Sequence, residues 1–179
     1  SVVEIGDYGF YGCPYLVNIN TGNVSVFGEY SFAVSTIVED GPSLNASLKS
    51  ATVIKPYAFC NSRLTNIEST NNLVTIGKYA FQANYFTDFI APKVETIGEG
   101  AFNSNQQLKT VVLSNVVRDI SFGAFNGCSS IKEFTYNDGN GSIKNNGKAN
   151  DYLLIDNGLI YNYMPNGKLQ LNSYPGGKT

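Results

Sequence analysis

The amino-acid sequence predicts a repeat solenoid, a fold in which short similar units stack along one axis. A six-residue phrase ending in Phe occurs six times, and the closing Phe residues lie 22, 27, 22, 21 and 23 residues apart. Apolar pairs precede and follow this phrase in five of the units. A unit of about 22 residues is too small to bury its own apolar face, so it must stack on its neighbours.

The phrase predicts the turns and the core of the solenoid. Its copies are Ile5–Phe10, Phe27–Phe32, Ile54–Phe59, Ile76–Phe81, Ile97–Phe102 and Ile120–Phe125. The segment around each Phe suits a short helical or 3₁₀ turn. We expect the six Phe side chains to form one continuous buried ladder, with about 1.5–3 kcal/mol from the burial of each ring.

The flanking pairs predict two walls of strands. The pairs that follow the phrase are Leu16/Ile19, Leu64/Ile67, Phe86/Phe89, Leu108/Val111 and Ile131/Phe134, and alternation extends the last two to Leu113 and Tyr136. This pattern predicts one short parallel strand per unit, with a spacing of about 4.8 Å between strands. The pairs that precede the phrase predict the opposite wall: Val2/Ile5, Val53/Ile54, Val74/Ile76, Val94/Ile97 and Val117/Ile120.

The repeated phrase resembles a known family. Ile76-Gly77-Lys78-Tyr79-Ala80-Phe81 and Gly123-Ala124-Phe125-Asn126-Gly127-Cys128-Ser129-Ser130-Ile131 are similar to the BspA-type leucine-rich repeat of Bacteroides-like surface proteins. The resemblance covers about residues 1–136. The second unit departs from it, because Phe27 replaces Ile and Ser31 replaces Ala, and most units lack the Cys. The resemblance implies a cell-surface or secreted protein that adheres to host matrix proteins, host cells or other bacteria.

Three segments are expected along the chain. Residues 1–136 form about six repeats, residues 137–150 form a polar linker loop, and residues 151–179 form a small β-hairpin module that interrupts or ends the array. The module is predicted from the turn signals Asp156-Asn157-Gly158 and Pro165-Asn166-Gly167 between apolar runs. The extra length of the second repeat is placed in a turn-rich loop, Glu39–Ser47. Because the chain opens inside a repeat, we expect it to be a piece of a longer protein.

Composition excludes several kinds of site. The chain has no His, which removes Ser-His-Asp and Cys-His machinery and the commonest zinc ligand. Cys13, Cys60 and Cys128 form no CxxC pair, and we expect three free thiols, two of them in the core. A net charge of −2 gives no indication of a basic surface that would bind nucleic acid. No apolar run is long enough for direct membrane insertion. We expect no cofactor.

The solvent-facing residues of the predicted strands are the candidate binding site. They form a polar, mildly acidic face, expected to be free of Lys and Arg, whose key members are Asn66, Glu68, Asp88, Thr110 and Glu133. Glu68 and Asp88 are expected roughly 5–8 Å apart, a separation that overlaps that of glycosidase carboxylates, although a solvated face is the simpler interpretation. A second candidate surface is the row Tyr8, Tyr30, Tyr57 and Tyr79.

The favoured function is non-enzymatic recognition at a cell surface, in which the solenoid face binds host or bacterial surface proteins such as matrix proteins. The alternatives are a glycan-binding module of a surface nutrient-capture system and a structural spacer. A parallel β-helix enzyme is the least favoured. Aromatic rings grouped on an exposed face would favour glycan binding, a broad polar face with a few exposed anchors would favour protein adhesion, and the absence of any ligand-sized surface feature would favour the spacer.

Overall fold

The computed structural model describes residues 2–34, 41–140, 142–144, 147–148 and 153–173. Its strands are β1 (Glu4–Ile5), β2 (Asn18–Asn20), β3 (Val26–Phe27), β4 (Leu44–Ser47), β5 (Val53–Ile54), β6 (Leu64–Glu68), β7 (Thr75–Ile76), β8 (Asp88–Ile90), β9 (Thr96–Ile97), β10 (Thr110–Ser114), β11 (Asp119–Ile120), β12 (Phe134–Asn137), β13 (Ile143–Lys144), β14 (Gly147–Lys148), β15 (Leu153–Asp156), β16 (Leu159–Tyr163) and β17 (Leu169–Ser173).

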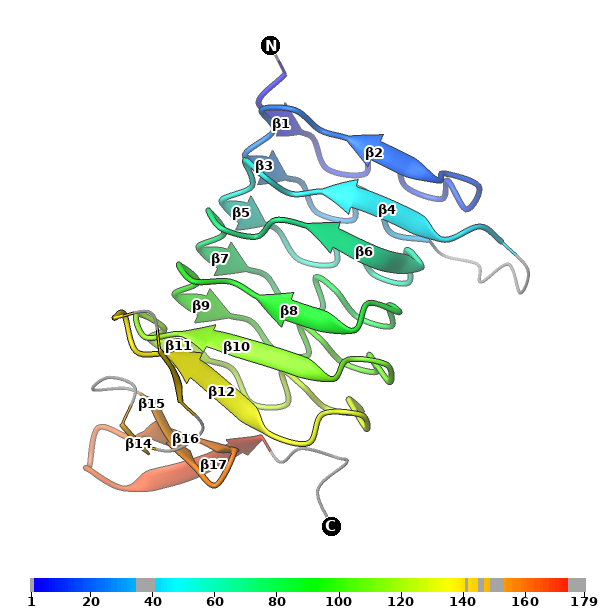
Figure 1. The fold of residues 1–179 in the computed structure, drawn as a ribbon. Coiled ribbons are helices and arrows are strands. Elements are labelled where there is room, and N and C mark those ends of the chain that lie inside the picture. Colours follow the sequence, from blue (N-terminus) through cyan, green and yellow to red (C-terminus); the bar gives the residue numbers. More distant parts are fainter. Residues whose placement is uncertain (1, 35–40, 141, 145–146, 149–152, 174–179) are drawn as a thin grey trace.

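Two walls of parallel strands form the solenoid, as the sequence predicts. The back wall is one sheet of six two-residue strands in the order β1-β3-β5-β7-β9-β11. The front face consists of two sheets, β2-β4-β6 and β8-β10-β12, and the latter is extended by antiparallel β13. Figure 1 shows the coils stacked along one axis, with the front strands facing the viewer.

The Phe ladder is confirmed, with one exception at its start. Neighbouring rings stack with centroids 4.9–5.6 Å apart, from Phe10 through Phe125. Phe59, Phe81 and Phe102 are fully buried, but Phe10 is 43% exposed. The exception has a simple cause: Phe10 belongs to the first coil, and only its side toward Phe32 is covered.

The turns around the ladder are not helical. The described residues contain no helix, so the predicted short helical turns are wrong in this detail. In the third coil, Ala58 N–H donates to Lys55 O and Cys60 N–H donates to Tyr57 O, which are the bonds of successive β-turns. The intervening Phe59 N–H donates to Ala80 O of the next coil. Every second donor is therefore used between coils, which prevents a continuous helical ladder.

A row of buried polar side chains lies three residues after the ladder Phe residues. Asn84 accepts hydrogen bonds from Leu64 N–H (2.8 Å) and Ser62 Oγ (3.0 Å) and donates to Phe59 O (2.7 Å). Asn105 repeats this role one coil later by donating to the carbonyl groups of Phe81 and Phe102. These amides satisfy backbone groups that the tight turns would otherwise leave unpaired in the core.

The cysteines are free, as expected, but only one of them is fully buried. Cys128 occupies the place of Asn105 in its coil, and its Sγ–H donates to Phe102 O at 3.0 Å. Burial raises the pKa of the Cys128 thiol to about 12. Cys60 is half-buried, whereas Cys13 is exposed because it lies in the first coil. The expectation of two thiols in the core is therefore wrong.

The second repeat contains a strand that the sequence interpretation placed in a loop. Leu44–Ser47 is β4, which pairs with β2 and β6, so the predicted loop Glu39–Ser47 is wrong over its second half. Residues 39 and 40 of this loop lie outside the described residues. Leu44 and Ala46 are buried while Asn45 and Ser47 are half-buried, which is ordinary period-2 alternation. The sequence interpretation missed β4 because this strand lies farther from its preceding ladder residue, Phe32, than the front strands of the other repeats lie from theirs.

The C-terminal module covers the last coil. Strands β14 to β17 form an antiparallel sheet, with turns at the two predicted places, Asn157-Gly158 and Pro165–Gly167. The segment 137–150, expected as a loop, also contributes β13 and β14. Ile155 and Ile160 are fully buried in the same core as the Phe ladder. The module is therefore packed against the solenoid, at the lower end of Figure 1.

Candidate functional site

The five predicted site residues lie on the front face, divided between its two sheets. Asn66 and Glu68 are exposed on β6, and Asp88 is exposed on β8. Thr110 is half-buried at the start of β10, directly opposite Asp88, and Glu133 is exposed just before β12. The five residues therefore follow one another from coil to coil, but the strand pairing of the face is interrupted between β6 and β8.

The interruption between β6 and β8 forms a shallow groove. These two strands form no strand pair, although Tyr85 N–H donates to Leu64 O at 2.9 Å beside them. The groove has a volume of about 300 Å³ and is lined by Ile67, Ser69, Thr70, Asn71, Asp88, Phe89 and Ile90. The cross-strand geometry from which a 5–8 Å separation of Glu68 and Asp88 was expected therefore does not apply here.

Asp88 is held ionised by its neighbours. Thr87 Oγ1 donates to Asp88 Oδ2 at 2.5 Å. This bond and a second one from Thr110 lower the pKa of Asp88 below its usual value. Burial acts in the opposite direction, and the charge of Lys109 adds the smallest lowering effect. A catalytic acid needs a raised pKa, so Asp88 is suited to electrostatic recognition rather than to protonating a leaving group.

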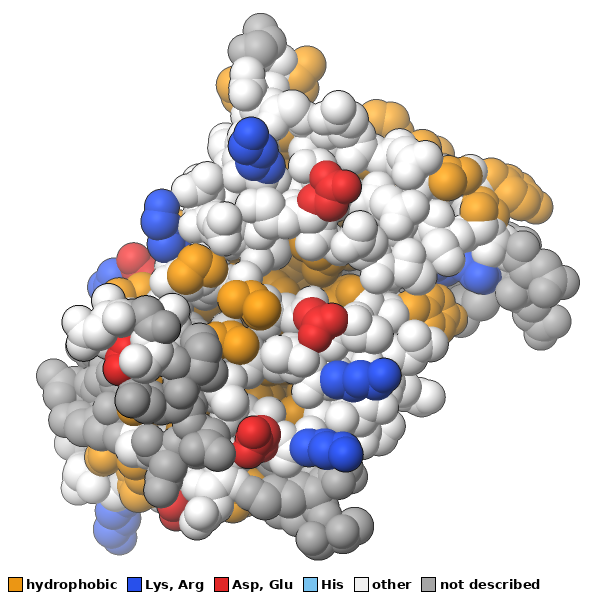
Figure 2. Space-filling model, viewed as in Figure 1, with side chains coloured by type: hydrophobic (Ala, Val, Ile, Leu, Met, Phe, Trp, Pro, Cys, Tyr) orange, Lys and Arg blue, Asp and Glu red, His pale blue; other side chains and the backbone are white. Residues whose placement is uncertain are grey.

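The front face is not free of basic residues, contrary to the expectation from its sequence. Lys109 lies one residue before β10, and Lys132 lies two residues before β12. Both are exposed and hold equivalent places in adjacent coils. With Ser129, Ser130 and Glu133 they line a hollow of about 600 Å³. Figure 2 shows basic side chains at the edge of this face beside isolated acidic ones. Residues that directly precede a strand also face solvent here. The expectation counted only alternating positions within each strand and therefore left them out.

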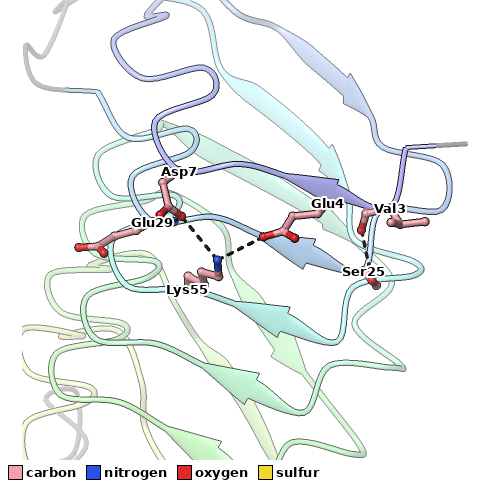
Figure 3. A network of polar contacts seen from close by, with 6 residues as sticks. All are labelled: Val3, Glu4, Asp7, Ser25, Glu29 and Lys55. Carbon is pink, nitrogen blue, oxygen red and sulfur yellow. Dashed lines mark hydrogen bonds and ion pairs between the residues drawn. The ribbon is translucent and has the colours of Figure 1, made fainter.

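Several charges of the back wall are paired between coils. Lys55 Nζ lies 3.2 Å from Glu4 Oε1 and 3.6 Å from Asp7 Oδ1, and so reaches across the second coil to the first (Figure 3). The hydrogen bond that Lys55 Nζ donates to Glu4 Oε1, followed by the charge of Asp7, raises the pKa of Lys55. Lys78 pairs with Glu99 at 2.8 Å, and Arg118 pairs with Glu95.

Two carboxylates of the front face differ from these. Neither Glu68 nor Asp88 takes part in any of these four ion pairs, which lie on the back wall or its adjoining turns. Because the partners on the back wall are exposed, their pairs contribute little to stability, and they neutralise only part of that surface, since Glu29 and Asp119 take part in none of these pairs. The front face thus keeps charges that a partner can meet.

The Tyr row is stacked ring on ring. Tyr8, Tyr30, Tyr57 and Tyr79 have neighbouring centroids 5.2, 4.6 and 5.3 Å apart, and each adopts a positive φ of 52–58°. The flat faces of Tyr30 and Tyr57 are thus covered by their neighbours in the row. Since sugar stacking needs an exposed ring face, this row offers little to a glycan.

The sequence interpretation missed two polar residues of the front face, Asn45 and Ser47, because β4 was taken as loop. Their register places Asn45 beside Asn18 and Asn66, and Ser47 beside Asn20 and Glu68. The alternation of Leu44 and Ala46 was the signal that would have found them. These residues complete a regular polar surface on the first three front strands.

Within the described residues no group of three or more Cys, Asp or Glu side chains is arranged to hold a metal ion. The same part of the chain contains no helix that is long and apolar enough to cross a membrane.

Solved structures with the same fold come from several bacteria. A leucine-rich repeat protein from Eubacterium ventriosum superposes with a TM-score of 0.67 at 21% identity, over 92% of this chain and 40% of that one. A leucine rich cell surface protein from Faecalibacterium prausnitzii gives 0.62 at 20% identity, over 97% and 50%. The pneumococcal vaccine antigen PcpA gives 0.58 at 18% identity, also over 97% and 50%. The chain thus spans half the length of these proteins or less.

No curated protein matches the sequence. The model of the BspA type leucine rich repeat region, in contrast, matches in six copies over residues 1–40 and 42–153. The repeat phrase, the two strand walls and the stacked Phe rings all lie within the matched residues. The match covers most of the chain, and the protein therefore belongs to the BspA-type leucine-rich repeat family.

Proposed function

We propose that this chain is a non-enzymatic recognition module of a bacterial surface protein and that its front face binds a protein partner. The exposed carboxylates of Glu68 and Asp88, which form no ion pair among the described residues, carry the proposal. The repeat family is generally non-catalytic, and proteins of the same fold include one described as a cell surface protein and one described as a vaccine antigen. Host matrix proteins are the class of partner that we would test first.

The charged half of the face, β8-β10-β12, is the expected centre of contact. Asp88 has a lowered pKa and stays ionised at any physiological pH, and Glu133 is exposed nearby. A partner that places basic side chains over these carboxylates gains charge-assisted hydrogen bonds and associates faster at low salt. Lys109 and Lys132 at the edge would meet acidic groups and so fix the orientation of the partner.

Binding to immobilised collagen, laminin and fibronectin tests this function. We expect at least one of them to bind, with an association rate that falls as salt is raised. The double variant Asp88→Lys, Glu133→Lys should weaken binding at least tenfold. The matched control Asp119→Lys, Glu29→Lys makes the same charge change on the back wall and should bind as the wild type does.

Two results would contradict the proposal. Unchanged affinity in the front-face double variant would move the site away from these carboxylates. If the chain binds neither the matrix proteins nor whole bacterial cells, the recognition function is wrong, and the spacer alternative accounts for the fold.

A further inference from the structure

The first three front strands carry a trough that differs from the charged half of the face. Two rows of polar side chains run along the solenoid axis: Asn18, Asn45 and Asn66 in one row, and Asn20, Ser47 and Glu68 in the other. The backbone of Ile19 and Ala46 lies between the rows. We call the hollow lined by Asn18, Asn20, Asn45, Ser47 and Glu68 the amide trough; its volume is about 350 Å³.

The amide trough offers mainly uncharged hydrogen-bonding groups, with Glu68 as its one charged side chain. Each Asn side chain offers a donor and an acceptor, Ser47 offers a hydroxyl, and Glu68 accepts through its two oxygens. Asn45 Nδ2 donates to Asn18 Oδ1 at 3.3 Å, which aligns the two amides and leaves further donors and acceptors on both. Glu68 forms no ion pair among the described residues, and no Lys or Arg lines the trough.

This set of groups matches hydroxyl-rich ligands. A sugar hydroxyl both donates and accepts, so adjacent hydroxyls satisfy an amide or a carboxylate with two bonds at once. An acidic ligand would find no basic side chain in the trough, and a basic ligand would find only the carboxylate of Glu68. The trough therefore fits a neutral saccharide better than an acidic or a basic polymer.

The spacing of the rows favours a chain of sugars over a peptide. Equivalent groups recur on neighbouring strands at about 4.8 Å. An extended peptide lying along the axis presents equivalent groups only every second residue, at about 6.6–6.8 Å, and loses register within two coils. A pyranose in an extended β-1,4-linked chain is about as long as the strand spacing. Successive rings are turned over by about half a turn, but a hexose ring carries hydroxyls on both edges, so a hydroxyl of each successive sugar would meet Asn18, Asn45 and Asn66 in turn.

We propose that the amide trough binds a neutral, extended β-linked glycan with one sugar unit per coil. This inference is independent of the protein-binding function, which is centred on Asp88 and Glu133. No aromatic side chain lines the trough, so binding rests on hydrogen bonds alone and is weak for a single chain. Repeated coils would add such contacts along a long polysaccharide.

The test is titration of the ¹⁵N-labelled protein with xylohexaose, cellohexaose or mannohexaose. We expect saturable shifts of the Asn18 and Asn45 side-chain amide signals with at least one of them. Maltohexaose has the same neutral hydroxyls in a curved α-linked chain and should bind at least tenfold more weakly. The double variant Asn18→Ala, Asn45→Ala should lose at least tenfold in affinity without a change in melting, because both side chains lie on the solvent side.

The variant Asp88→Lys, Glu133→Lys is the matched control and should keep full glycan affinity. Failure of the protein-binding function and failure of this inference are therefore distinguishable. Absence of shifts with all three β-linked oligosaccharides would overturn the inference, as would equal binding of maltohexaose or unchanged affinity in the Asn double variant. Shifts of these amides with a glycine–serine peptide and not with sugars would show that the trough binds peptides and would also overturn it.

Discussion

The side chain three residues after each ladder Phe determines whether the tight turns can be buried. Ser62, Asn84, Asn105 and Cys128 occupy this place in successive coils. Asn is best suited to it, since one amide both accepts from a backbone N–H and donates to two carbonyl groups. Cys128 keeps only the donor function, toward Phe102 O. The position thus requires a small side chain with a donor.

Replacement of Asn84 by Ala tests the importance of this row. The change leaves Leu64 N–H without its acceptor in the core and removes one donor from the Phe59 carbonyl, which keeps the bond from Ser62 Oγ; a lost partner in the core costs about 1–3 kcal/mol. We expect the free energy of unfolding to fall by about 3 kcal/mol in urea titrations. Asn126→Ala, at an exposed turn position, is the control and should change it by less than about 0.5 kcal/mol. Equal effects of the two variants would contradict the role of the row.

At the scale of single elements, the close stacking of turns explains the Gly that follows β3, β7 and β9, whereas Lys55 and Ser121 hold this place after β5 and β11. A Cβ on Gly98 would lie 2.6 Å from Lys78 N of the preceding coil, and one on Gly77 would lie 2.5 Å from Pro56 N. Backbone cannot yield as a flexible side chain can. The Gly is needed here for close approach and not for an unusual φ.

Gly98→Ala should therefore destabilise the protein by about 1–3 kcal/mol, through displacement of the Lys78 turn. Gly6→Ala is a matched control, because Gly6 holds the same place in the first coil and has no atom within 4 Å of its ideal Cβ. We expect its melting temperature to stay near that of the wild type. A similar loss in both variants would contradict the explanation by contact between coils, because Gly6 has no such contact.

These elements also show how far the sequence could predict the structure. The Phe spacing predicts the register of the back wall and of the ladder, because the same residue type recurs at the same place in each coil. β4 was missed because residues inserted after Phe32 displaced Leu44 and Ala46 from the usual distance. The division of the front face between β6 and β8 has no counterpart in the sequence pattern, since it depends on how two complete coils pair.

The site was predicted less completely than the fold, for a related reason. Asn66, Glu68 and Asp88 were placed correctly on the solvent side by alternation alone. Lys109 and Lys132 were excluded because they precede the alternating run, and Asn45 was excluded with β4. Alternation gives the face of a side chain within a strand but not which residues outside the strand share that face.

For the molecule as a whole, the C-terminal module completes the hydrogen bonding of the last coil. Along the back wall, an N–H of each coil donates to the preceding coil: Gly28 to Ile5 O, Lys55 to Phe27 O, Gly77 to Ile54 O, Gly98 to Ile76 O and Ser121 to Ile97 O. The next acceptor in the series is Ile120 O. It receives the side-chain amides of Asn162, at 2.9 Å, and of Asn172 instead of a backbone N–H.

The module therefore acts as a cap, and loss of its contacts should destabilise mainly the last coil. In a solenoid each coil contacts only its neighbours, so the loss of end contacts first loosens the last coil. The double variant Asn162→Ala, Asn172→Ala leaves Ile120 O without these donors at the boundary with the module. Hydrogen exchange should become faster at Ser121 and Ala124, whose amides donate within and next to that coil, while Gly77 and Phe81 in the central coils keep their protection.

Gln170→Ala on the same strand as Asn172 is the control, because Gln170 is exposed and its replacement should leave all these rates unchanged. Equal acceleration in every coil would show that the solenoid opens as one cooperative unit, and unchanged exchange at Ser121 would show that the two amides do not cap it.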